Sequence, residues 1–133
     1  MRTLIITLAC AAVLALSGVS QAAQIASPIL YGNEDQVFAQ CIVVNSGTTP
    51  LTVTLKILDS FGLTVATDNC DGSLDAEEFC TRALAIDNQT AYACIATAGS
   101  VATLRGTLVL EEKVPNPSTG GTFRRPIRSA PLW

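Results

Sequence analysis

The chain contains no histidine, and aromatic residues make up only 5% of it. Without histidine the usual general base is missing, and neither a Ser-His-Asp nor a Cys-His arrangement can form. No C-x-x-C pair and no Gly-rich phosphate loop occur either, so the spacing of a zinc site and of a nucleotide-binding turn are both absent. These absences argue against an enzyme, and we expect a non-enzymatic protein without cofactors.

The apolar run at residues 4–16 is too short to cross a membrane, which takes about 20 apolar residues. It follows the positively charged Arg2 and precedes small residues that end at Ala22, which is the layout of a secretory signal peptide. We expect residues 1–22 to be removed after Ala22, with Ala23 as the second choice. The mature chain would then be secreted or periplasmic, without a stable membrane span.

Positive charge is scarce, with 8 Lys and Arg against 11 Asp and Glu. This acidic balance argues against a nucleic-acid partner, because phosphate binding needs a concentrated basic surface. The last twenty residues are different, since they contain Arg124, Arg125 and Arg128 and no acid. Three interpretations of this basic tail are open: a solvated end, a segment that folds back on the acidic body, or a site for an acidic partner.

No window after the signal has helical periodicity, and period-2 alternation and turn residues dominate instead. The clearest case is the run at 51–58, where every second residue is apolar. The expected strands cover 24–30, 37–44, 51–58, 63–67, 81–86, 91–98 and 104–111. Strands separated by turns at this regular spacing predict an antiparallel sandwich of about seven strands.

Beyond Val114 the composition shifts to Pro, Gly, Ser, Thr and Arg. Prolines at positions 115, 117, 126 and 131 are expected to exclude a regular ladder, which predicts an extended tail over residues 114–133. The chain would then consist of a signal peptide at 1–22, a β-sandwich domain at 23–113 and this tail.

Four cysteines remain after removal of the signal: Cys41, Cys70, Cys80 and Cys94. An even number in a small exported chain indicates two disulfides, for which three pairings exist. Cys70 and Cys80 flank the strong turn Asp71-Gly72, so a short closed loop between them is geometrically easy.

The stretch from Cys41 to Glu112 resembles the immunoglobulin-like or fibronectin-III-like sandwiches of small exported bacterial proteins. The resemblance rests on the segment CIVVNSG at 41–47, on the strand and turn at 51–62, and on Tyr92-Ala93-Cys94. The last tripeptide is similar to the tyrosine corner, a Tyr two residues before the second intersheet cysteine. The resemblance implies an immunoglobulin-like fold in which Cys41 pairs with Cys94, which leaves Cys70 to pair with Cys80. The third strand lacks the Trp of this pattern, and many unrelated functions use the architecture.

The acidic stretch at 67–78 is the one motif that points to a ligand. If Gly72 is the sixth residue of a calcium loop, its oxygen ligands are Asn69, Asp71, Asp75 and Glu78. Thr67 stands where such a loop needs its first Asp, and the flanks are strand-like rather than helical. We therefore expect an acidic, disulfide-closed turn without a metal, and keep calcium binding as the alternative.

Two smaller features leave their meaning open. Asn88-Gln89-Thr90 matches the N-glycosylation acceptor, although a turn alone explains these residues. Trp133 ends the chain either as an anchor for a partner or as a frayed end.

The sequence thus predicts a secreted or periplasmic module that binds an unknown protein or surface ligand, or has a structural role. One alternative is a calcium-binding module built on residues 67–78. The other is a self-assembling subunit whose tail adds a strand to the exposed sheet edge of a neighbouring molecule.

Overall fold

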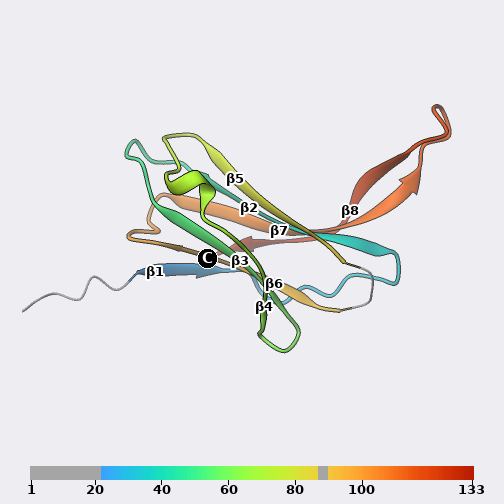
Figure 1. Ribbon diagram of the computed structural model, residues 1–133, viewed down its shortest axis with the longest axis horizontal. Helices are drawn as coiled ribbons and strands as arrows, with labels where there is room; N and C mark the ends of the chain where they lie inside the picture. The colour runs from blue at the N-terminus through green and yellow to red at the C-terminus, as the bar shows by residue number, and fades with distance from the viewer. Residues whose placement is uncertain (1–21, 87–89) are drawn as a thin grey trace, which may run out of the picture.

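The computed structural model describes residues 22–86 and 90–133, so the predicted signal peptide at 1–22 and Asn88 lie outside the described residues, apart from Ala22. Within these residues the chain forms eight strands and one short 3-10 turn (Figure 1). The all-β prediction is confirmed. The elements are β1 (Ala23–Ala26), β2 (Gln36–Asn45), β3 (Val53–Asp59), β4 (Thr64–Asp68), η1 (Cys70–Gly72), β5 (Phe79–Ala85), β6 (Tyr92–Ala98), β7 (Leu104–Pro115) and β8 (Thr122–Leu132).

The strands form two four-stranded sheets. One sheet has the order β1-β6-β3-β4 and the other the order β5-β2-β7-β8, and every neighbouring pair is antiparallel. Cys41 on β2 is bonded to Cys94 on β6, and neither residue is exposed. The disulfide therefore joins the inner faces of the two sheets at the centre of the molecule.

The alternation at 51–58 has the predicted consequence. On β3 the side chains of Val53, Leu55 and Ile57 are fully buried between the sheets, whereas Lys56 points outward and is exposed. Facing them from β7 are Leu108 and Leu110, which are also fully buried. Burial of one such aliphatic side chain contributes about 1.5–3 kcal/mol. Small residues complete this core, among them Ala39, Cys41, Cys94, Ala96 and Ala98.

Both cysteine pairs are those predicted. Cys41 and Cys94 have Cα atoms 5.8 Å apart, and Cys70 and Cys80 have Cα atoms 5.5 Å apart, which are ordinary disulfide separations. The second bond ties η1 to the beginning of β5 across a loop of 10 residues. The disulfides thus connect the sheets at the centre and close the acidic loop at its base.

The first strand is shorter than predicted, because it ends at Ala26 rather than at Leu30. Pro28 explains the difference, since proline has no N–H to donate to a ladder. The chain nevertheless continues along β6, where Leu30 forms an isolated bridge with Tyr92.

The C-terminal segment is the main difference from the sequence prediction. Residues 122–132 form β8, which pairs with β7 over most of its length, so the expectation that prolines exclude a ladder here is wrong. β8 is an edge strand, and a proline is tolerated there where its missing N–H would face away from the neighbour. Pro126 lies opposite Glu111, directly beside a register shift between Leu110 and Glu111. This bulge-like irregularity accommodates the proline within the ladder.

The last residue is held by its backbone. The N–H of Trp133 donates to the carbonyl of Ala26 at 3.2 Å, and its carbonyl accepts from the N–H of Ala26 at 3.0 Å. Because β8 belongs to one sheet and β1 to the other, this pair connects the two sheets along one edge. The chain end is therefore not frayed, while the indole itself is 73% exposed.

In the part of the chain that the structure describes, no helix has the length and apolar character of a membrane span.

Candidate functional site

The hairpin of β7 and β8 extends beyond the sandwich. β2 pairs with β7 only as far as Gln36 and Glu112, whereas β8 pairs with β7 as far as Thr122 and Pro115. Figure 1 shows the hairpin, in orange and red, leaving the two sheets and ending in a free turn. We call residues 113–124 the arm. Its strands have only each other as ladder partners, so the arm is available for contact with another molecule.

The arm and the segment after it carry positive charge. Residues 113–133 contain Lys113, Arg124, Arg125 and Arg128 and no acid. Phe123 adds an aromatic ring that is 45% exposed. Phe123 precedes Arg124 on the strand and therefore lies on the opposite face of the arm. The arm thus carries cations and, on its other face, an exposed aromatic side chain, two side-chain types that are common in binding sites.

One face of the arm places two cations directly opposite each other. Lys113 is the ladder partner of Arg124, and like charges in opposite positions destabilise a sheet. The Arg124 guanidinium lies 3.6 Å from the centre of the Phe38 ring, and the Lys113 ammonium lies 5.9 Å from it. Glu111 offsets part of the charge at 3.7 Å from Arg124. Lys113 forms no ion pair with any described residue, so this face retains positive charge.

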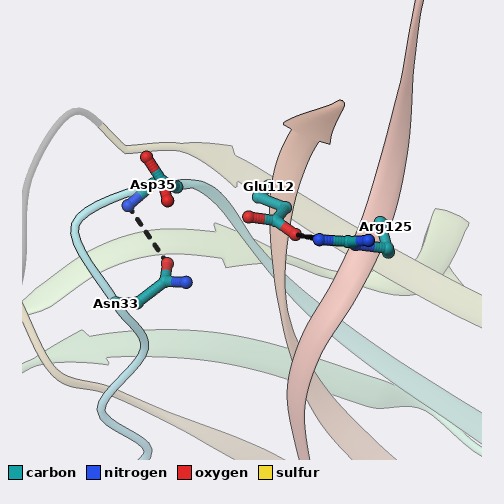
Figure 2. Close-up of polar contacts among 4 residues, drawn as sticks. All are labelled: Asn33, Asp35, Glu112 and Arg125. Atoms are coloured by element: carbon teal, nitrogen blue, oxygen red, sulfur yellow. Dashed lines mark hydrogen bonds and ion pairs between the residues drawn. The ribbon is translucent and has the colours of Figure 1, made fainter. Parts of the chain in front are cut away.

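The other face contains a tighter ion pair at the base of the arm. Arg125 on β8 donates from Nε to Oε1 of Glu112 on β7 at 2.7 Å, and its Nη2 pairs with the same oxygen (Figure 2). The Glu112 side chain is only 8% exposed, whereas that of Arg125 is 59% exposed. A carboxylate buried to this degree needs its partner, so the pair fastens the two strands where the arm leaves the sheet. The basic tail is therefore not a solvated end: it folds back on the body through β8 and this ion pair, and the exposed cations of the arm leave the interpretation as a site for an acidic partner open.

A hollow of about 390 Å³ lies beside this ion pair. We call it the basal hollow; it is lined by Gly32, Asn33, Asp35, Glu112, Arg125, Ile127 and Arg128. Asn33 accepts a hydrogen bond from the N–H of Asp35 at 3.1 Å, which shapes the loop on one side (Figure 2). The lining carries guanidinium, carboxylate and amide groups, so its chemistry suits recognition of a polar group.

A second, smaller hollow of about 160 Å³ lies at the acidic loop. We call it the acidic hollow; it is lined by Asp68, Cys70, Asp71, Leu74, Glu78, Phe79, Cys80 and Thr81. The Phe79 ring at its rim is 70% exposed. Carboxylates and an exposed ring together suit a cationic side chain, because a cation is attracted to both.

The three acids of the calcium alternative form no cluster of metal-ligating side chains. Asn69 accepts a hydrogen bond from Thr54 at 3.2 Å, and Glu78 accepts one from the N–H of Asp75 at 2.8 Å. Among the described residues, the one group of three His, Cys, Asp or Glu side chains with clustered ligand atoms is Asp68, Cys70 and Cys80. Its two sulfurs form a disulfide and are not the thiolates that bind metals. Asp71, Asp75 and Glu78 thus belong to no cluster of this kind.

Asn45 is a structural residue, whose position in the segment CIVVNSG indicates only a local turn. Its amide is fully buried and donates to the carbonyls of Thr49 at 2.8 Å and Leu74 at 3.1 Å. Its Oδ1 accepts from the N–H of Gly47 at 3.0 Å and from the Thr103 hydroxyl at 3.2 Å. One side chain therefore holds three loops together, including the segment that lines the acidic hollow. The Asn-Ser-Gly sequence signals the local turn but not the two distant partners.

Comparisons with protein families, with curated proteins and with solved structures find no match to this chain. What the chain binds is therefore inferred from the chemistry of its surfaces.

Proposed function

We propose that the mature chain is an exported, non-enzymatic binding module and that the arm is its contact surface. The observation that carries the proposal is the hairpin itself, whose last ladder rows extend beyond β2 and present Lys113, Phe123 and Arg124. Within the chain, these rows bury almost nothing: Phe123 and Arg124 on β8 are both exposed, as is Lys113 on β7. A projecting segment that adds little to the core is explained by contact with a partner.

The partner that fits this surface is a protein with an acidic patch. The arm contains two cations and no acid, while the rest of the chain is strongly acidic. A nucleic acid or another extended polyanion would be repelled by that body, whereas a local acidic patch would meet only the arm.

An immunoglobulin-like arrangement is part of the proposal. β2 lies beside β5, and β3 beside β6, as strands B and E and strands C and F do in that fold. The Cys41–Cys94 bond joins the strands that correspond to B and F, and Tyr92 precedes Cys94 by two residues. The outer strands depart from the pattern: β1 lies beside β6, where strand G would be, and β7 lies beside β2, where strand A would be.

Export is supported by the two disulfides and by the signal-like residues 1–22. Disulfides persist in oxidising compartments, such as the extracellular space and the bacterial periplasm, and are rare in reducing ones.

A photo-reactive residue in place of Phe123 tests the proposed contact surface in the producing cells. We expect a defined cross-linked product through position 123 that is lost when Arg124→Glu is added. The matched control places the same residue at Lys56, which is exposed on β3, a strand of the other sheet. If position 123 gives no product beyond that of position 56, the arm is not the contact surface.

The calcium alternative is tested separately, by titration calorimetry of the mature chain. We expect no tight binding, because Asp71, Asp75 and Glu78 belong to no group of three clustered metal-ligating side chains and the first ligand position holds Thr67. Micromolar affinity that disappears in Asp71→Ala and Glu78→Ala would establish a calcium module instead.

A further inference from the structure

The chain separates its charges between two ends. No Lys or Arg occurs between Lys56 and Arg82, and this stretch contains six acids. Three of them, Asp68, Asp71 and Glu78, line the acidic hollow. Figure 1 shows η1 and the beginning of β5, which form this hollow, at the opposite end of the molecule from the arm. The acidic hollow is therefore out of reach of the arm of the same molecule.

The arm retains charge that the chain does not neutralise. Lys113 and Arg124 repel each other across the ladder, and Glu111 is the single acid within ion-pair distance of either among the described residues. Acidic groups placed against this face from outside would remove the repulsion and gain two attractive pairs. In the isolated molecule, this face of the arm therefore keeps positive charge that the neighbouring acids do not neutralise.

The acidic hollow has a size and lining that match one side chain of the arm. Its volume of about 160 Å³ is close to the ~150 Å³ of a protein cavity that holds a benzene ring. Its lining offers an inserted guanidinium the carboxylates of Asp71 and Glu78 and the side chain of Phe79, which is 70% exposed. Arg124 already stacks on Phe38, so its guanidinium can lie between two rings when a second molecule docks.

We propose that the occupant of the acidic hollow is the arm of a second copy of this chain, with Lys113 and Arg124 against Asp71 and Glu78. The proposal rests on the proposed function, because it needs the arm to be a contact surface. Donor and acceptor are different surfaces at opposite ends, so the contact is heterologous and each molecule can use both. Repetition of such a contact gives rings where the rotation between molecules closes, and open chains where it does not.

Sedimentation of the disulfide-bonded mature protein at increasing concentration tests self-association. We expect dimers and longer species at low salt, and an association constant that falls by roughly tenfold on raising the salt, because the contact is made by exposed charge pairs. A protein that is still monomeric at about 1 mM in low salt, where even weak contacts form, overturns the proposal.

Exchange of charges identifies the two surfaces. Lys113→Glu/Arg124→Glu and Asp71→Lys/Glu78→Lys should each be monomeric alone, whereas an equal mixture should associate again, since each altered surface then finds its complement. Lys56→Glu is the control: it removes a cation that lies outside the arm, so this variant should associate like the wild type. Asp71→Asn/Glu78→Gln provides a milder form of the loop change if the lysine variant does not fold, and should weaken association in the same direction.

The inference is also overturned if self-association is unchanged by these substitutions. It is overturned as well if the mixture stays monomeric although both variants fold. The cross-linking at position 123 separates this failure from failure of the proposed function. A product with a different protein leaves the arm as the contact surface and excludes the second copy, whereas the absence of any product excludes both.

Discussion

The two disulfides differ in the length of chain that each of them closes. Cys41–Cys94 closes 53 residues of chain with both cysteines fully buried, and Cys70–Cys80, which is also buried, closes 10 residues. In the chain-entropy model these loops stabilise the fold by about 4 and about 3 kcal/mol, as upper values.

Replacing Cys41 and Cys94 by Ala should therefore lower the melting temperature more than replacing Cys70 and Cys80. The loss is greater because the unfolded chain gains more freedom and because the removed sulfurs leave a gap between the sheets. Calorimetry on both double variants measures the difference. Equal melting temperatures would mean that loop length does not decide the contribution in this fold.

Asn45 shows how much one buried polar residue contributes to the stability of the fold. Asn45→Ala removes four hydrogen bonds of a fully buried side chain; the partly buried Thr103 hydroxyl loses this partner, and the Leu74 carbonyl keeps only the N–H of Leu51. We expect a loss of about 2–4 kcal/mol in the free energy of unfolding, since each buried polar group that loses its partner costs roughly 1–3 kcal/mol.

Chemical denaturation measures that loss. Asn33→Ala is the matched control, because Asn33 accepts a single local hydrogen bond at an exposed turn; it should change stability by no more than about 0.5 kcal/mol. Similar losses in both variants would contradict a specific role for the buried amide.

At the scale of elements, β8 consists of two parts with different roles. Its beginning belongs to the arm and is exposed, whereas Ala130 and Leu132 near its end are buried against the core. Gly106 on β7 makes room there: a Cβ at this position would lie 2.7 Å from the Ile42 carbonyl oxygen and 3.2 Å from Leu132. The end of β8 therefore closes the sandwich, and its beginning serves the surface.

Shortening the hairpin tests this division. Removal of residues 114–123, with a two-residue turn in their place, should leave the melting temperature almost unchanged, because these residues bury little apolar area. Removal of residues 130–133 should lower it by several degrees, because two buried side chains and the Trp133–Ala26 pair are lost. The reverse order would show that the arm, and not the end of β8, supports the fold.

For the whole molecule, the predicted removal of residues 1–22 can be compared with the position of the first strand. β1 begins at Ala23, whose ladder partner is Ala98, so a cut after Ala22 leaves β1 complete and a cut after Ala23 removes one row. We expect mature protein that begins at Ala23 or Gln24, and the intact mass of material from the medium or periplasm determines this. A membrane-bound product that retains residues 1–22 would contradict export by cleavage.

Much of the fold follows from patterns that are local along the chain. The alternation on β3 is set by the period of two residues in a strand, and its inward side chains are those that the pattern predicts. The turn after β3 is local as well: Asp59 accepts from the N–H groups of Phe61 and Leu63 at 2.9 Å, and Gly62 has a φ of 77°. The pairing of Cys70 with Cys80 belongs with these, because ten residues and a turn decide it.

Contacts between distant residues decided the rest. The prolines of β8 predict that this segment is not a central strand. That it pairs at all depends on the free edge of β7, which only the fold provides. The partners of Asn45 at positions 74 and 103 are brought to it by the packing of the sheets. The sequence by itself therefore determined strands β1 to β7 in outline, the turn after β3 and the Cys70–Cys80 bond, because each depends on neighbouring residues. The tertiary structure decided the arm and the two hollows, because a surface is formed by residues that only the fold brings together.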